Sequence, residues 1–203
     1  MLFLDTIAPR TLDLLKRIQA EPFFGNCRLV GGTALALQLG HRKSIDLDFF
    51  GSFEPDATLV KTVLGKNGNV QTIQESKSIF QYIVDDVKVD AVNYPYGWIS
   101  PAVEEASLVL ASPEDIAAMK LASITNRGAK KDFIDFYELL NLFTLRQMLD
   151  FYRKKYAESA LFTTLKSLAW FEDAEHDPDP VMLRDYTWED VKKRISAEIE
   201  RLA

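Results

Sequence analysis

Two aspartates interrupt an apolar segment, "IDLDFF" at residues 45–50. Side chains alternate across a strand, so Asp46 and Asp48 are expected to share one face while the apolar side chains beside them share the other. Asp is depleted in strands, and neighbouring like charges repel each other. A Mg²⁺ ion reverses that balance, because it takes one or two carboxylates together with phosphates and water. Taken alone, such a pair is also typical of a solvent-facing strand side, so its surroundings decide its meaning.

A third carboxylate interrupts a later strand in the same way. In "VKVDAV" at 87–92, Asp90 breaks a Val/Ala alternation. If this strand pairs beside the first one in a single sheet, three carboxylates can converge on one point. Asp85 and Asp86 are weaker candidates, because Asp in a hairpin turn needs no functional explanation.

A glycine pair precedes the acidic segment, in "VGGTALAL" at 30–37. The pattern predicts a strand, a Gly-Gly turn and then a helix start, where backbone N–H groups suit phosphate. It is neither a Walker A loop nor the dinucleotide-binding glycine fingerprint. The alternative is a plain strand-to-helix turn with Thr33 as an ordinary N-cap.

Basic residues stand near both features. Arg42 and Lys43 lie just before the acidic strand. Lys120 and Arg127 are two helical turns apart and share a face if one helix extends that far. Arg grips phosphate bidentately and Lys acts as a point charge, so these residues could neutralise a polyphosphate. The alternative for "RGAKKD" at 127–132 is a solvated helix junction.

Composition bounds the class of protein. The chain has 203 residues, 47% hydrophobic and 27% charged, with a net charge of −6. This fits one globular domain, or one with an appendage, and argues against a general nucleic-acid binder held by its overall field. The basic runs at 153–155 and 192–194 are predicted to be solvated helix faces. Cys27 is the only cysteine, which suits a reducing cytoplasm, and two histidines disfavour a His/Cys zinc site.

Periodicity predicts an α+β fold, a small mixed sheet with flanking helices followed by a helical C-terminal half. We find neither a signal peptide nor an apolar run that could cross a bilayer. The predicted strands are 27–32, 44–51, 69–75, 78–84 and 87–94. The predicted helices are 11–20, 33–40, 55–68, 112–126, 130–143 and 187–203. We place a core at 1–110 and a helical region at 111–203.

At this point two blocks resemble a known family. "GGTALALQLGHRKSIDLDFF" at 31–50 resembles the signature of nucleotidyltransferase toxins of the AbiEii/AbiGii type, in the DNA polymerase β-like superfamily. "KLASITNRGAKKDFIDFYELL" at 120–140 is similar to the second block of that family. The resemblance covers roughly 25–142 and implies a polymerase β-like nucleotidyltransferase core.

The resemblance implies roles for individual residues. Asp46, Asp48 and Asp90 would hold metal. The residues that would bind the nucleotide are Gly31, Gly32, Thr33, Arg42, Ser44, Lys120, Arg127 and Lys131. Lys120 and Asp135 would join the three metal-binding aspartates as catalytic residues, and Asp132 also falls in the second block.

The implied reaction transfers a nucleotide from a nucleoside triphosphate to an acceptor hydroxyl, with one or two Mg²⁺ and release of pyrophosphate. Asp90 or Asp135 could accept the proton. The resemblance further implies a toxin-like role in the cytoplasm, an RNA acceptor such as tRNA, and a cognate antitoxin protein. Two alternatives stay open: a small-molecule or protein acceptor, and a nucleotide-binding module without turnover.

Overall fold

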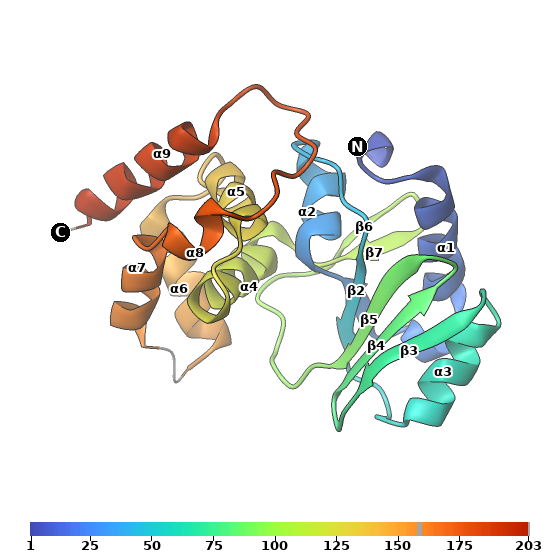
Figure 1. The fold of residues 1–203 in the computed structure, drawn as a ribbon. Coiled ribbons are helices and arrows are strands. Elements are labelled where there is room, and N and C mark those ends of the chain that lie inside the picture. The colour runs from blue at the N-terminus through green and yellow to red at the C-terminus, as the bar shows by residue number, and fades with distance from the viewer. Residues whose placement is uncertain (158–159, 203) are drawn as a thin grey trace. The chain divides into compact units, whose positions relative to one another are not determined.

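The computed structural model describes residues 1–157 and 160–202. These residues form two compact units, which we describe separately (Figure 1). The first unit comprises residues 1–95 and 102–111, and the second comprises 96–101 and 112–203. The division into domains at residue 110 stays a prediction. In the described part of the chain, no helix combines the length and the apolar character that a bilayer crossing needs.

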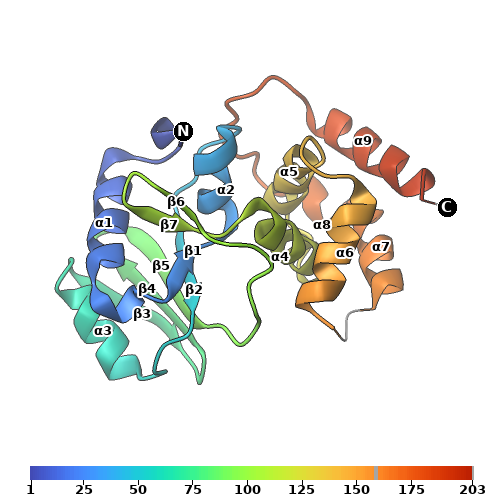
Figure 2. The same cartoon turned by 180° about the vertical axis from the view of Figure 1, so that it is seen from behind.

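The first unit is built on one mixed sheet. Its strands are β1 (Cys27–Leu29), β2 (Leu47–Gly51), β3 (Val70–Glu75), β4 (Ile79–Val84), β5 (Val87–Asn93), β6 (Val103–Glu105) and β7 (Leu108–Leu110). They lie in the order β3-β4-β5-β2-β1-β7-β6 (Figures 1 and 2). The β2–β5 and β1–β7 pairs are parallel and the other neighbours are antiparallel. β2 and β5 therefore lie side by side although a hairpin separates them in the chain.

Helices of the first unit begin and end at residues that favour those positions. They are η1 (Leu4–Thr6), α1 (Pro9–Ala20), η2 (Pro22–Phe24), α2 (Gly31–Leu39) and α3 (Ala57–Gly65). Proline stands in the first turn of α1, where its missing N–H has no helical role. The Asp56 side chain caps α3. Gly40, with φ +68°, ends α2 in the left-handed conformation that glycine adopts without strain.

The apolar face of the sheet forms the core of the first unit. Leu47 of β2 lies beside Val89 of β5, which lies beside Tyr82 of β4, and all three are fully buried. Because strand side chains alternate, the next position on each strand belongs to the opposite face. The hydrophobic row therefore fixes a neighbouring polar row on the other side of the sheet.

The second unit is helical, as the fold prediction required. It contains α4 (Pro113–Asn126), α5 (Lys130–Leu139), α6 (Leu145–Lys155), α7 (Leu161–Leu168), α8 (Glu172–Glu175) and α9 (Trp188–Glu200). The helices α5, α6 and α7 all pack on α4. Ser112 caps α4 as predicted, and Thr144 and Thr187 form capping boxes at the starts of α6 and α9.

The structure confirms the central hairpins and corrects the ends of other elements. Asp85 and Asp86 have φ of 45° and 66° and form the expected turn between β4 and β5. The short hairpin β6–β7 was not predicted, because three-residue strands carry too little alternation. The two glycines predicted as a turn are instead the first residues of α2.

Each of the two basic runs contains one residue with fixed partners, Lys155 or Arg194, whereas Arg153, Lys154 and Lys193 are exposed as predicted. The Lys155 side chain is fully buried, and its Nζ lies 2.7 Å from Asp115 Oδ1 and 3.0 Å from the Gly97 carbonyl oxygen. Arg194 donates to the Leu140 carbonyl at 2.8 Å and lies over the Tyr137 ring. Partners distant in sequence produce this burial, so local charge patterning could not reveal it.

Candidate active site

Register places the two aspartates of the strand interiors side by side. Asp48 of β2 is directly opposite Asp90 of β5 in the parallel pair. Gln81 of β4 is opposite Asp90 on its other side. The expectation that the two acidic strands are neighbours in one sheet is therefore confirmed. Asp46 stands one residue before β2 begins.

The two oxygens of Asp90 have different surroundings. Oδ2 accepts from Lys88 Nζ at 2.7 Å and from Gln81 Nε2 at 2.8 Å. Oδ1 is buried and has no hydrogen-bond partner among the described residues. A buried acceptor left unmet costs about 1–3 kcal/mol, and more when it is charged. Asp90 therefore presents one fixed oxygen and one oxygen that suits a cation.

Lys88 is a member of the acidic cluster that sequence reasoning missed. Burial lowers its pKa, but the hydrogen bond to Asp90 and the charges of Asp90, Asp48 and Asp46 outweigh burial and raise the pKa above its ordinary value. All three predicted metal-binding carboxylates therefore act on one ammonium group. The available signal was its position two residues before Asp90, which puts both side chains on the same strand face.

The glycine at the start of α2 lies against Asp48. Gly31 has φ +69°, and a Cβ built on it would collide with the Asp48 carboxylate. The Val30 N–H donates to the Asp48 carbonyl oxygen at 2.8 Å, which holds the two segments together. No side chain caps α2, and the first N–H groups of a helix have no partner within it. Donors that suit an anion therefore stand beside a carboxylate that suits a metal.

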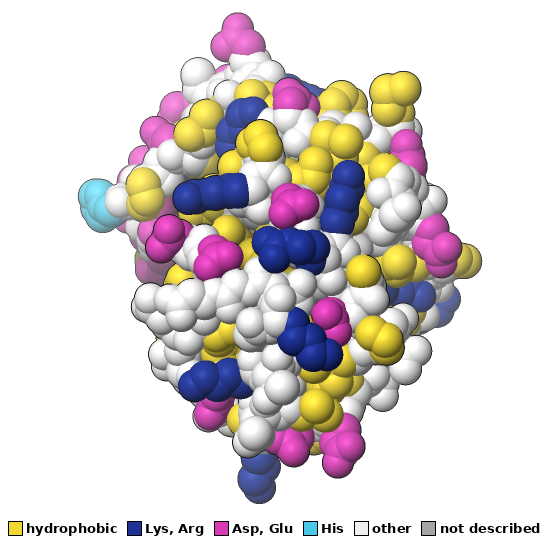
Figure 3. Space-filling model, turned by 90° about the vertical axis from the view of Figure 1, so that its right-hand side faces the viewer, with side chains coloured by type: hydrophobic (Ala, Val, Ile, Leu, Met, Phe, Trp, Pro, Cys, Tyr) yellow, Lys and Arg dark blue, Asp and Glu magenta, His cyan; other side chains and the backbone are white. Residues whose placement is uncertain are grey.

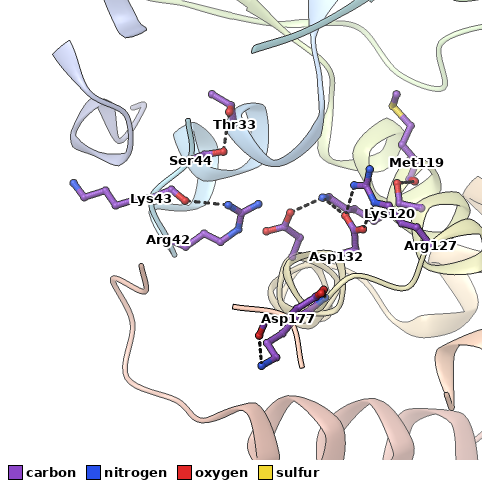
Figure 4. A network of polar contacts seen from close by, with 12 residues as sticks. Thr33, Arg42, Lys43, Ser44, Met119, Lys120, Arg127, Asp132 and Asp177 are labelled. Carbon is purple, nitrogen blue, oxygen red and sulfur yellow. Dashed lines mark hydrogen bonds and ion pairs between the residues drawn. The ribbon is translucent and has the colours of Figure 1, made fainter. Parts of the chain in front are cut away.

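Two side chains that were predicted to bind phosphate, those of Thr33 and Ser44, make contacts that hold the segment leading into β2. Val30 is the N-cap of α2, so the alternative in which Thr33 caps the helix is wrong. Thr33 is buried, and its hydroxyl contacts Ser44 Oγ at 2.8 Å (Figure 4). The same hydroxyl donates to the Asp46 carbonyl oxygen. Thr33 and Ser44 therefore position Asp46, and phosphate contact by their side chains stays a prediction.

Arg42 is buried in the same segment. Its Nη1 donates to the Lys43 carbonyl oxygen at 3.0 Å (Figure 4). This contact folds the side chain back along its own backbone, and the predicted role of Arg42 in phosphate binding remains an expectation.

The second predicted block forms a buried ionic cluster in the second unit. Lys120 Nζ lies 2.9 Å from Asp132 Oδ1 and 2.5 Å from Asp135 Oδ2. Arg127 grips Asp132 through Nε at 2.8 Å and Nη2 at 3.0 Å (Figure 4). Burial raises the pKa of Asp132, but Lys120 and Arg127 outweigh it, so that pKa is held below its ordinary value. Two cations therefore keep Asp132 ionised.

The solvated-junction alternative for residues 127–132 is wrong for Asp132, although Arg127 and Lys131 are exposed. Asp132 and Asp135 are fully buried, and Lys120 is 4% exposed. The helix α4 ends at Asn126, so Arg127 is its C-cap and does not continue the helical face of Lys120. The two cations meet at Asp132 because the chain turns at Gly128, which has φ +56°. Lys131 is exposed, and its nucleotide contact stays a prediction.

The predicted site residues thus fall into two groups. The first unit brings together Gly31, Asp46, Asp48 and Asp90, and the second brings together Lys120, Arg127, Asp132 and Asp135. Within the described residues, no three His, Cys, Asp or Glu side chains form a ready-made metal cage. Mg²⁺ does not require one, because substrate phosphates and water complete its coordination.

Comparison with known proteins identifies the family. Residues 13–201 match the family described as "Nucleotidyl transferase AbiEii toxin, Type IV TA system". An uncharacterized protein of Aquifex aeolicus is 30% identical over 171 residues, which cover 81% of this chain and 83% of that protein.

Solved structures share the fold at lower identity. MenT4, a nucleotidyltransferase toxin of Mycobacterium tuberculosis, is 20% identical with a TM-score of 0.59, covering 97% of this chain and 87% of that one. JHP933 from Helicobacter pylori is 18% identical with a TM-score of 0.56, covering 97% and 93%. The chain therefore belongs to the AbiEii family of nucleotidyl transferase toxins of type IV toxin–antitoxin systems.

Proposed function

We propose that the protein transfers a nucleotide from a nucleoside triphosphate to an acceptor hydroxyl in a Mg²⁺-dependent reaction that releases pyrophosphate. The observation that carries this proposal is the Asp48–Asp90 pair with its partnerless buried Oδ1. The start of α2 beside Asp48 supports a phosphate position next to the metal. Asp46, Asp48 and Asp90 would hold Mg²⁺, which when bound neutralises charge that develops on the phosphates.

The remaining roles belong to the chain's own groups. The N–H groups at the start of α2, including Gly31, Gly32 and Thr33, would bind phosphate oxygens. Lys120 and Arg127 would hold the nucleotide as cations whose positions Asp132 fixes. The proton of the acceptor hydroxyl would go to Asp90 or Asp135, and comparing pH–rate profiles of the two Asp→Asn variants separates these choices.

We further propose an RNA acceptor, of which tRNA is the form implied by the family resemblance. A pocket in the second unit supports this class. Its lining includes Trp170, the cations Arg127 and Lys166, the polar residues Thr125, Asn126 and Ser167, and one carboxylate, Asp173. Trp170 is 55% exposed, and an exposed aromatic ring beside cations is the usual platform for an unpaired base, at about 1–3 kcal/mol per stacked base.

Overall charge does not supply the RNA affinity. The net charge is −6, and on the face that carries α1 and α3 the Lys and Arg side chains are interspersed with Asp and Glu (Figure 3). Binding would therefore depend on a local site. We expect Trp170→Ala to weaken RNA binding about tenfold or more. Phe162→Ala is the matched control, because Phe162 is an exposed aromatic residue of α7 that does not line the pocket.

Labelled triphosphates test the function directly. The protein is incubated with each α-labelled nucleoside triphosphate, Mg²⁺ and total RNA, and the labelled product is identified. We expect label in RNA, and loss of most labelling in folded Asp46→Asn and Asp48→Asn variants. Label in protein or in small molecules would establish the other acceptor class. Metal-dependent triphosphate binding without transfer would indicate a non-catalytic module.

The family also implies a partner protein. We propose that a cognate antitoxin counteracts the protein in the cytoplasm. Expression of the wild-type chain is expected to slow growth, whereas Asp48→Asn is expected not to. Equal growth with both chains would contradict a toxic role that depends on this site, while leaving the transfer reaction to the labelling experiment.

A further inference from the structure

We propose that Lys88 is a resident cation of the Asp46/Asp48/Asp90 cluster. Its ammonium group holds Asp90 Oδ2 and takes the place of one of the two divalent ions that such a cluster could bind. On this basis the cluster takes one divalent ion in the absence of nucleotide. The inference rests on the proposed metal-dependent function and assigns a positioning residue to it.

The hydrogen bonds of Asp90 show that its two carboxylate oxygens have different roles. Lys88 Nζ and Gln81 Nε2 both donate to Oδ2, at 2.7 and 2.8 Å. Oδ1 is buried without a hydrogen-bond partner in the described part of the chain. Two donors on one oxygen fix the carboxylate plane, so Oδ1 keeps a defined direction before any ion arrives. Lys88 therefore positions Asp90 while leaving one oxygen for a metal.

Charge decides how many ions the cluster accepts. Asp46, Asp48 and Asp90 carry three negative charges when ionised, and the Lys88 ammonium, 2.7 Å from Asp90 Oδ2, reduces the sum to −2. One divalent cation neutralises that charge. A second would have to bind at a cluster already neutral and close to an ammonium, which is unfavourable in a partly buried site.

The exposure of Lys88 suits this role. Its side chain is 36% exposed while that of Asp90 is 13% exposed. The ammonium is therefore anchored to the carboxylate while it keeps access to solvent. A lysine whose ammonium did not reach the cluster would act on stability alone, and its removal would leave metal binding unchanged.

Lys88→Gln separates the two cases because only the loss of an ammonium inside the cluster strengthens Mn²⁺ binding. Without the ammonium the cluster regains a full negative charge, so we expect Mn²⁺ to bind about tenfold tighter or better, and a second ion to appear. Nucleotide transfer is expected to fall in the same variant, since Asp90 loses a donor that fixes it. Binding is measured by electron paramagnetic resonance titration of Mn²⁺ without nucleotide.

Three variants control for charge and packing. Lys88→Arg keeps the charge and should bind Mn²⁺ as the wild type does. Lys61→Gln removes an exposed lysine of α3 and should change neither affinity nor number of ions. Gln81→Leu removes the neutral donor to Asp90 and should lower transfer while leaving Mn²⁺ affinity within about twofold. Thermal unfolding confirms that each variant is folded.

Different failures identify different errors. If Lys88→Gln binds Mn²⁺ no more tightly than wild type, or if wild type binds two ions, the resident-cation proposal is wrong while the metal site stands. If wild type and all folded variants bind no Mn²⁺, with or without a triphosphate, the metal-dependent function fails and this inference fails with it.

Discussion

Gly31→Ala is the substitution that most directly links the fold to the site. Gly31 has φ +69°, and placing a residue with a Cβ in that region costs about 1–2 kcal/mol. The new Cβ would also collide with the Asp48 carboxylate, and overpacking of this kind adds about 1–3 kcal/mol. We therefore expect the free energy of unfolding to fall by about 2–5 kcal/mol.

The chain offers a matched control for the backbone contribution. Gly128 also has a left-handed φ, +56°, but a Cβ there would meet its nearest atoms at 3.6 and 3.9 Å, which is ordinary contact. Gly128→Ala should therefore cost only about 1–2 kcal/mol. Urea unfolding of both variants isolates the collision with Asp48 as the difference between them.

A double-mutant cycle tests whether the new Cβ of Gly31→Ala collides with the Asp48 carboxylate. In an Asp48→Ala background the carboxylate is absent, so Gly31→Ala should cost no more than Gly128→Ala does in the wild type. In the background that keeps Asp48, displacement of the carboxylate should also weaken Mn²⁺ binding. The reasoning is refuted if Gly31→Ala costs the same as Gly128→Ala, or if the cost is unchanged when Asp48 is removed.

Further predictions concern the buried ions of the second unit. Lys155→Met should lower the free energy of unfolding by about 3–5 kcal/mol, because it leaves Asp115 buried and without its cation. Lys154 is its exposed neighbour, and Lys154→Met should change the free energy of unfolding by less than about 0.5 kcal/mol in the same urea titration. The pKa of Asp132 is lowered in the folded state, so its contribution to stability is present above its unfolded pKa of about 3.9 and is lost as pH falls through the folded value. Asp132→Asn should therefore reduce stability at neutral pH and flatten its dependence on pH below about 4, measured by urea unfolding across that range.

Alternation along single strands predicted that Asp48 and Asp90 lie on the polar faces of their strands, and their meeting depended on the two strands being neighbours. The apolar partners of Asp48 and Asp90 pack into the core, and a register that buries Leu47 against Val89 necessarily sets the two acids opposite each other. The same rule applied to "VKVD" places Lys88 on the acidic face. It was missed because a lysine on a half-exposed strand face is also typical of a solvated position, so its spacing from Asp90 did not single it out.

Other features depended on contacts that no local pattern contains. Lys155 and Asp115 are 40 positions apart, and nothing in the run at 153–155 distinguishes the buried lysine from its exposed neighbour. The glycine pair was predicted as a turn because two glycines disfavour a helix interior. In the structure, Gly31 begins α2 in a left-handed conformation, which lets the backbone pass close to Asp48.

The aspartates of this protein differ in how fully other residues of the chain compensate their charge. This difference distinguishes aspartates that stabilise the fold from those that can take part in the reaction. Asp115 receives Lys155, the Ser112 hydroxyl and two backbone N–H groups, and Asp132 receives Lys120 and Arg127. A carboxylate compensated in this way gains little from a further cation. Asp90 has partners on Oδ2 alone, and its buried Oδ1 has none among the described residues. Because a folded chain rarely leaves a buried polar oxygen unmet, this oxygen of Asp90 is the position at which we propose that the metal of the proposed reaction binds.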